Sequence, residues 1–223
     1  MGPNRPIFLN IFIEHSNFMG TTMPKISLTT FIDFVHKSNS PRLTCVRQAK
    51  KQYESKESFP DYWRLLREQI IKVHKENLGL DALDEVLSHV KDPRRKQNYK
   101  ICIENYKCIF KRKDVNYSGS AKKIWTHSEL DISVNPEFFI IVDGIKYMAK
   151  LHFKSKLKLD INKLHAIFYL MELTRPRDKG EYSPAMIDLR NCKIIPKPSR
   201  QIPNIDMLLN VEASAFLDIW NRL

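Results

Sequence analysis

Residues 138–159 of this chain read FFIIVDGIKYMAKLHFKSKLKL, and this stretch decides the fold of the second half. Five consecutive apolar residues are followed by Asp143-Gly144, a pair that favours a two-residue hairpin turn. After the turn, basic and apolar residues alternate. Because successive side chains of a strand point to opposite faces of a sheet, the pattern predicts two antiparallel strands joined by a tight turn.

The second of these strands is predicted to hold basic side chains on one face and apolar side chains on the other. Between residues 146 and 158 every even position is basic except Met148. The members of this basic ladder are Lys146, Lys150, His152, Lys154, Lys156 and Lys158. The ladder indicates a surface that meets anions, although charged residues also protect an edge strand against unwanted pairing.

Further elements are predicted on both sides of the hairpin. Residues 130–134 alternate apolar and polar side chains and form a preceding strand. Residues 159–173 form a helix, and residues 186–189 form a strand that pairs with residues 194–195. A last helix covers residues 205–223.

The first half of the chain has helical periodicity. Between residues 23 and 113 apolar side chains recur at steps of three and four, and both Ser27 and Asp92-Pro93 suit helix starts. Residues 114–223 form an α+β region, and residues 1–22 are an extension that is expected to pack poorly. The predicted fold class is therefore α+β, with an N-terminal helical region, a small mixed sheet of order β-β-β-α-β and flanking helices in one compact unit.

The composition indicates a globular protein with a polyanionic partner. The 223 residues are 43% hydrophobic and 28% charged, which excludes an intrinsically disordered chain. A net charge of +12 and a pI near 9.5 indicate DNA or RNA as the partner. No run approaches the roughly 20 apolar residues of a membrane span, so no membrane partner is expected.

The sequence has no metal or cofactor motif. Its four cysteines lack the spacing of a zinc site and are expected to be reduced thiols in a bacterial-type cytoplasmic protein. Its six glycines form no nucleotide-binding loop. No cofactor is therefore expected, except Mg²⁺ if the chain is a nuclease.

A second basic surface is predicted on the helix that begins at Asp92-Pro93. Apolar and aromatic residues line one side of this helix, and a row of lysines follows another side. The members of this lysine stripe are Lys96, Lys100, Lys107 and Lys111. Ladder and stripe would both contact phosphates, which positions a nucleic acid without reading its sequence. A solvated helix face without a ligand is the alternative.

The order of elements in residues 122–195 resembles the PD-(D/E)XK nuclease core in its RecB-like form. That core has a three-strand meander, a helix and a further strand, with an acid near one strand end and a (D/E)-x-K motif on the next strand. The resemblance implies a divalent cation and a water held over a phosphodiester. It implies a site made of Glu137, Asp131 and Lys150, with Asp143 as a further acid in the region.

The chain departs from the motif of that family. Met148 stands two residues before Lys150, and His152 stands two residues before Lys154, where the motif has an acid. Cleavage would then need a site built from other residues, such as Glu137. The ladder is thus better suited to holding a polyanion than to cutting one.

Other functions remain open at the level of sequence. His127, His152 and His165 would serve a metal-free ribonuclease if two of them converged near a lysine. Residues 42–53 would form a basic helix that imitates a helix-turn-helix reader. The leading prediction is a nucleic-acid-binding protein, with a divergent PD-(D/E)XK-like nuclease and a subunit that docks onto an acidic protein partner as alternatives.

Overall fold

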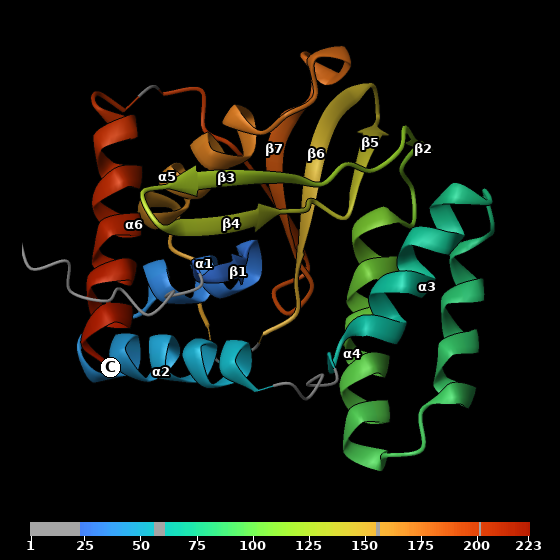
Figure 1. The fold of residues 1–223 in the computed structure, drawn as a ribbon. Helices are drawn as coiled ribbons and strands as arrows, with labels where there is room; N and C mark the ends of the chain where they lie inside the picture. The colour runs from blue at the N-terminus through green and yellow to red at the C-terminus, as the bar shows by residue number, and fades with distance from the viewer. Residues whose placement is uncertain (1–22, 56–60, 155–156, 201) are drawn as a thin grey trace, which may run out of the picture.

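The computed structural model describes residues 23–55, 61–154, 157–200 and 202–223. The fold is α+β, as the sequence predicts, and two sheets lie among helices (Figure 1). The predicted extension, residues 1–22, lies outside the described residues. No helix in the described ranges is long and apolar enough to cross a membrane.

The part of the chain before residue 114 is largely helical. A short strand, β1 (Lys25–Ser27), leads directly into α1 (Leu28–His36). The Ser27 hydroxyl caps α1 by accepting a hydrogen bond from the Thr30 N–H at 3.1 Å, as its residue type predicts. The remaining elements are α2 (Ser40–Glu54), α3 (Arg64–Lys75), the 3₁₀ helix η1 (Leu80–His89) and α4 (Pro93–Phe110).

A five-stranded sheet forms the centre of the molecule, in the order β2-β5-β6-β7-β8. Its antiparallel meander comprises β2 (Val115–Tyr117), β5 (Phe138–Val142) and β6 (Ile145–His152). The predicted hairpin is present, since Asp143 and Gly144 both adopt positive φ between β5 and β6. Helix α5 (Ile161–Leu173) then leads to β7 (Ser183–Asp188), which is parallel to β6, and β8 (Lys193–Pro196) completes the sheet.

A second sheet of three strands contains the segment predicted to precede the hairpin. Here β4 (Leu130–Val134) lies between β3 (Lys123–His127) and β1, antiparallel to β3 and parallel to β1. The predicted order, in which residues 130–134 join the central sheet, is therefore wrong in this detail. β2 takes the place beside β5 that was predicted for residues 130–134. This strand of three residues is too short and too polar to be recognised from periodicity.

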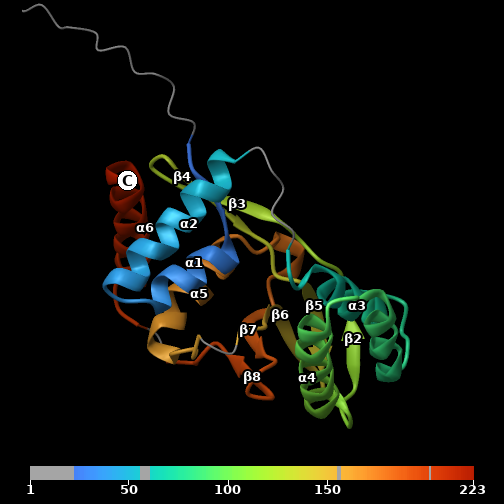
Figure 2. The same ribbon diagram turned by 90° about the horizontal axis from the view of Figure 1, so that it is seen from below.

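Two apolar cores lie on opposite faces of the central sheet. One core joins α1, α2, α5, the second sheet and α6 (Ile205–Arg222), and the other joins α3, η1 and α4. Figure 2 shows α3 and α4 on one side of the central strands and α1, α2 and α6 on the other. The N-terminal helices are thus divided between the two faces, which buries both faces of β6.

Candidate functional site

A buried ion pair lies where the end of β6 meets the start of β5. Glu137 directly precedes β5, and its N–H donates to the carbonyl oxygen of Ala149 at 2.9 Å. This pairing places Glu137 beside Lys150, whose Nζ lies 2.7 Å from Glu137 Oε1. Both side chains are only 3% exposed. Burying two charges is tolerated because each neutralises the other in a region of low dielectric.

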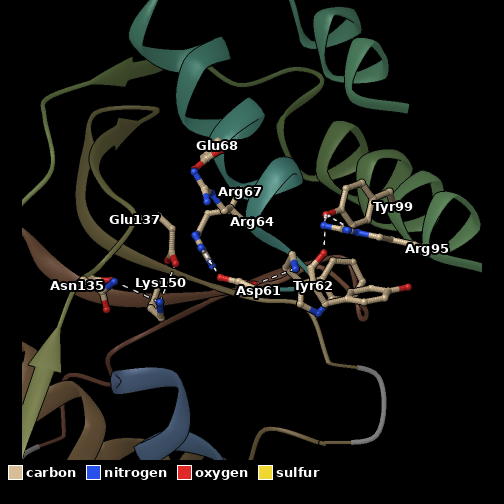
Figure 3. Close-up of polar contacts among 11 residues, drawn as sticks. Asp61, Tyr62, Arg64, Arg67, Glu68, Arg95, Tyr99, Asn135, Glu137 and Lys150 are labelled. Atoms are coloured by element: carbon tan, nitrogen blue, oxygen red, sulfur yellow. Dashed lines mark hydrogen bonds and ion pairs between the residues drawn. The ribbon is translucent and has the colours of Figure 1, made fainter. Parts of the chain in front are cut away.

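Both oxygens of the Glu137 carboxylate are occupied. Oε2 accepts the backbone N–H of Leu151 at 2.6 Å, while Oε1 accepts from Lys150. Lys150 Nζ also lies 3.4 Å from the carbonyl oxygen of Asn135 (Figure 3). Glu137 therefore joins the start of β5 to the end of β6, where one side chain and one backbone N–H donate to it.

The other acids proposed for a nuclease site lie elsewhere. Asp131 is in the second sheet, where it accepts a hydrogen bond from the Thr126 hydroxyl at 2.7 Å. Asp143 is in the hairpin turn and pairs with Lys113 at 2.8 Å. Of the predicted catalytic residues the fold brings together Glu137 and Lys150, and it separates Asp131 from them.

The basic ladder alternates as predicted along β6, but Lys150 and His152 in its middle do not meet open solvent. The even residues of β6 face the core that contains α1 and α5, because β6 is the central strand of its sheet. Lys150 and His152 are 3% and 5% exposed. At these two positions the strand presents no exposed cation to a ligand.

Two other members of the ladder are paired with carboxylates. Lys146 pairs with Glu181, and Lys154 pairs with Asp33 of α1. Lys158 is exposed, and Lys156 lies outside the described residues. Three lysines of the ladder, Lys146, Lys150 and Lys154, therefore have carboxylate partners within the protein.

His152 is held by backbone carbonyl groups. Its Nε2 lies 3.1 Å from the carbonyl oxygens of both Lys154 and Leu157. Burial lowers the pKa of His152, and the two carbonyl oxygens together with Asp188 and Asp33 oppose that shift. The ring thus joins the end of β6 to the backbone of Lys154 and Leu157.

The lysine stripe of α4 is mostly exposed. Lys96, Lys100 and Lys111 are exposed, and no carboxylate in the described ranges pairs with them. Lys107 instead bridges Asp81 at 2.7 Å and Asp84 at 2.8 Å, which joins α4 to η1. Three members of the stripe thus remain available to an anion, and Lys107 has a structural contact.

A cleft of about 410 Å³ opens above the Glu137–Lys150 pair. Its walls come from the start of α1, the end of α2, the segment before α3 and the end of β6. Side chains at its lining include Gln52, Tyr62, Trp63, Arg67, Lys150 and Lys154. The sequence reasoning missed Asp61, Tyr62 and Arg67, because only the packing of α3 against the sheet brings them to β6.

Asp61 and Arg67 form a second ion pair in this cleft. Arg67 reaches from α3 to Asp61 with a nitrogen–oxygen distance of 2.5 Å (Figure 3). Asp61 also accepts the N–H of Trp63 at 2.9 Å. Burial acts to raise the pKa of Asp61, but Arg67, the Trp63 N–H and Lys150 outweigh it and hold that pKa below its ordinary value. Asp61 is therefore an anion that fixes Arg67 at the opening.

Aromatic rings form the wall of the cleft next to Asp61. Trp63 stacks on Phe153 at a centroid distance of 5.0 Å and on Tyr99 at 5.5 Å. Tyr62 packs edge-on against Trp63 at 4.8 Å and keeps 39% of its surface exposed. The Tyr99 hydroxyl donates to the Tyr62 carbonyl oxygen at 2.6 Å, which joins this wall to α4.

The site does not contain the donors of a typical metal centre. In the described part of the chain, no three His, Cys, Asp or Glu side chains lie together as a metal would need. Met148, at the position of the acid in a (D/E)-x-K motif, is 1% exposed and packs in the apolar core. Glu137 is the acid nearest to Lys150, and both of its oxygens already have donors.

Two of the histidines considered for a ribonuclease, His127 and His152, have partners within the described residues. His127 contacts the Ser214 hydroxyl at 2.9 Å, on the face shared by the second sheet and α6. His152 contacts backbone carbonyl groups, and no hydrogen bond among the described residues joins it to His127 or His165. His127 and His152 are thus held by different parts of the fold.

The basic helix α2 packs against α6. Arg42 pairs with Glu212 and lies 3.9 Å from the ring centroid of Phe34. Lys50 donates to the carbonyl oxygen of Trp220 at 3.0 Å. A helix-turn-helix reader would use the cations Arg42, Arg47, Lys50 and Lys51, and two of these, Arg42 and Lys50, thus hold the helix to the protein.

Comparison with known proteins gives no relative for this chain: no family model, no curated protein and no solved structure matches it.

Proposed function

We propose that this protein binds nucleic acid at the cleft beside β6 and along the exposed part of α4. The observation that carries the proposal is the pairing of cations with aromatic rings at one opening. Arg67 and Lys154 supply positive charge there, and Tyr62 and Trp63 supply ring faces and edges. Proteins that hold single-stranded nucleic acid combine these two features, because phosphates need cations and unstacked bases need aromatic surfaces.

Two cations at the opening are accessible to a phosphate. The Lys154 side chain is 42% exposed and that of Arg67 is 28% exposed. Each already has a carboxylate partner, so its position is set before a ligand arrives. An incoming phosphate would share the cation with Asp33 or Asp61, and the high net charge of the protein would favour its approach.

The exposed lysines of α4 extend the basic surface beyond the cleft. Tyr99 of α4 packs on Tyr62, and Arg95 of α4 lies 5.3 Å from the Tyr62 ring centroid. Lys96 and Lys100 flank these residues in the sequence and are exposed. A strand that placed one phosphate at Arg67 would therefore meet further cations along α4.

The binding experiment is a salt titration of a fluorescently labelled single-stranded oligonucleotide, measured by anisotropy. We expect the wild-type affinity to fall steeply with salt, and Lys154→Gln to reduce the slope of log K against log salt by about 1, because one phosphate contact is lost. Lys197→Gln is the matched control, since Lys197 also pairs with a carboxylate, Glu172 at 2.7 Å, outside the cleft. Equal effects of both variants, or no binding at low salt, would contradict the proposal.

A divergent PD-(D/E)XK-like nuclease is the second candidate. The contact between Glu137 and Lys150 at the floor of a cleft favours it, as does the order β2-β5-β6-α5-β7. Glu137 would be its remaining acid and Lys150 its lysine, while Met148 replaces the acid of the motif.

Cleavage of a labelled oligonucleotide with Mg²⁺ and with EDTA tests this candidate. If the protein is a nuclease, Mg²⁺-dependent product appears, and Glu137→Gln abolishes it while the variant still folds. Asp206→Asn, which changes an exposed carboxylate on α6, should leave the cleavage rate unchanged. Product that persists in Glu137→Gln would exclude the Glu137–Lys150 site as its source.

A further inference from the structure

Two thiols from distant parts of the sequence meet on the outer side of α4. Cys192 lies in the turn between β7 and β8, where its φ of 49° is unusual for a residue other than glycine. Its Sγ donates to the carbonyl oxygen of Asn105 at 3.5 Å. Asn105 and Cys108 are three residues apart on α4 and so share a face of the helix. The Cys192 thiol also forms a hydrogen bond with the Cys108 thiol.

The turn that carries Cys192 is held against α4 by a second contact. The side-chain amide of Asn105 donates to the carbonyl oxygen of Leu189 at 2.7 Å. Asp188 is 1% exposed and accepts the N–H groups of Arg190 and Asn191 at 3.1 and 3.2 Å, which shapes the turn. Cys192 is consequently fixed beside the helix.

The two thiols differ in exposure. Cys108 is exposed and lines a surface hollow of about 740 Å³ together with Lys107 and Lys111. Cys192 is partly buried, and its hydrogen bond with the Cys108 thiol, followed by burial, raises the pKa of Cys192 to about 11. Cys45 and Cys102 are buried, and burial raises the pKa of both. Cys108 is thus the accessible thiol, and Cys192 is its immediate neighbour.

We propose that Cys108 and Cys192 form a reversible oxidation site, at which hydrogen peroxide converts the two thiols into a disulfide between α4 and the β7–β8 turn. The Cys108 thiol gives up its proton, its thiolate attacks one peroxide oxygen and the O–O bond breaks. The hydroxide that leaves takes up that proton to become water, and Cys108 becomes a sulfenic acid. The Cys192 sulfur then attacks the Cys108 sulfur, the S–O bond breaks, and a second water leaves. Two thiols lose two electrons, and one peroxide gains them.

The disulfide would connect segments that are far apart in the chain. Closing a long loop restricts the unfolded chain, so oxidation should stabilise the folded protein if the bond forms without distorting the turn. Reduction by a small dithiol would restore both thiols.

Peptide mass spectrometry of the full chain, treated with hydrogen peroxide and then alkylated under denaturing conditions, tests the proposal. We expect a peptide linked through Cys108 and Cys192, a fall in free thiols from four to two, and a thermal midpoint that rises by several degrees and returns after dithiothreitol. Free Cys108 and Cys192 after full oxidation, or a disulfide between two chains through Cys108, would overturn it.

Single variants separate the two steps. In Cys192→Ser the reaction should stop at the sulfenic acid of Cys108, which dimedone traps, and in Cys108→Ser the Cys192 thiol should survive. Cys102→Ala is the control, because this buried thiol on α4 is expected to take no part and the linked peptide should still form. A linked peptide involving Cys45 or Cys102 in the wild type would contradict the assignment.

Discussion

Replacing Lys150 by methionine is expected to lower the free energy of unfolding by about 3–5 kcal/mol, because it leaves the Glu137 carboxylate buried without its cation. Glu137 and Lys150 are each 3% exposed, and their 2.7 Å contact is the principal compensation for removing both charges from water. The Leu151 N–H would remain as a donor to Glu137, but one neutral donor does not balance a full charge. Urea denaturation followed by circular dichroism measures the loss.

A double variant separates the loss of the cation from the loss of the side chain. Glu137→Gln combined with Lys150→Met removes both charges and should recover most of the stability, since neutral replacements of buried ion pairs are often tolerated. Lys100→Met is the matched control on an exposed lysine of α4, with an expected change within about 0.5 kcal/mol. A loss in Lys150→Met no larger than in this control would mean that the ion pair does not stabilise the fold.

Acidification from pH 7 to pH 5 is expected to cost about 2 kcal/mol of stability through His74 alone. Burial lowers the pKa of His74 to about 4, from an ordinary value of 6.5. Between these two values the unfolded chain binds the proton and the folded protein does not, so the proton stabilises the unfolded state. The stability contributed by the neutral ring is therefore present above pH 6.5 and is lost as the pH falls toward 4.

The physical reason for this shift is the environment of the ring. His74 Nε2 lies 2.6 Å from the hydroxyl of Tyr106, a fully buried residue, and Phe110 and Phe138 pack around the ring. No carboxylate of the described residues contacts it, so nothing there compensates a positive charge. Burial also lowers the pKa of His36 and His152, and both act in the same direction as His74.

Urea denaturation at a series of pH values tests the effect of His74. His74→Gln keeps a polar partner for Tyr106 and should flatten the dependence of stability on pH between 7 and 5. His89→Gln changes an exposed histidine at the end of η1 and should leave that dependence as in the wild type. Identical pH profiles for His74→Gln and the wild type would show that His74 is not the group responsible.

Local features of the fold were predictable because they depend on neighbours in the sequence. The caps of α1 and α4, the turn at Asp143-Gly144 and the extent of α6 follow from residue type and periodicity. The pairing of the strands was harder to predict from the sequence. Residues 130–134 form the predicted strand, but only its contact with β1 shows that it belongs to a second sheet.

The candidate site was predictable only in part, because tertiary contacts bring some of its residues together. Glu137 and Lys150 were named through the resemblance to the PD-(D/E)XK core, and the register of the hairpin brings them into contact. Asp61 and Arg67 were not, since they lie before and within a helix that reaches the sheet through tertiary packing. Tyr62 and Trp63, which form the aromatic wall, were assigned to no site because they too reach the sheet only through tertiary packing.

The amino-acid sequence by itself determined the α+β class, the net charge, the hairpin and the alternation of basic and apolar residues in β6. Periodicity and turn chemistry act over a few residues, so the sequence alone reveals them. Only the tertiary structure decided which way the basic face of β6 points. That face is covered because β6 is the central strand with helices on both sides. Within the cover Lys150 is neutralised by Glu137, while Lys146 pairs with Glu181 and Lys154, just beyond the strand, pairs with Asp33.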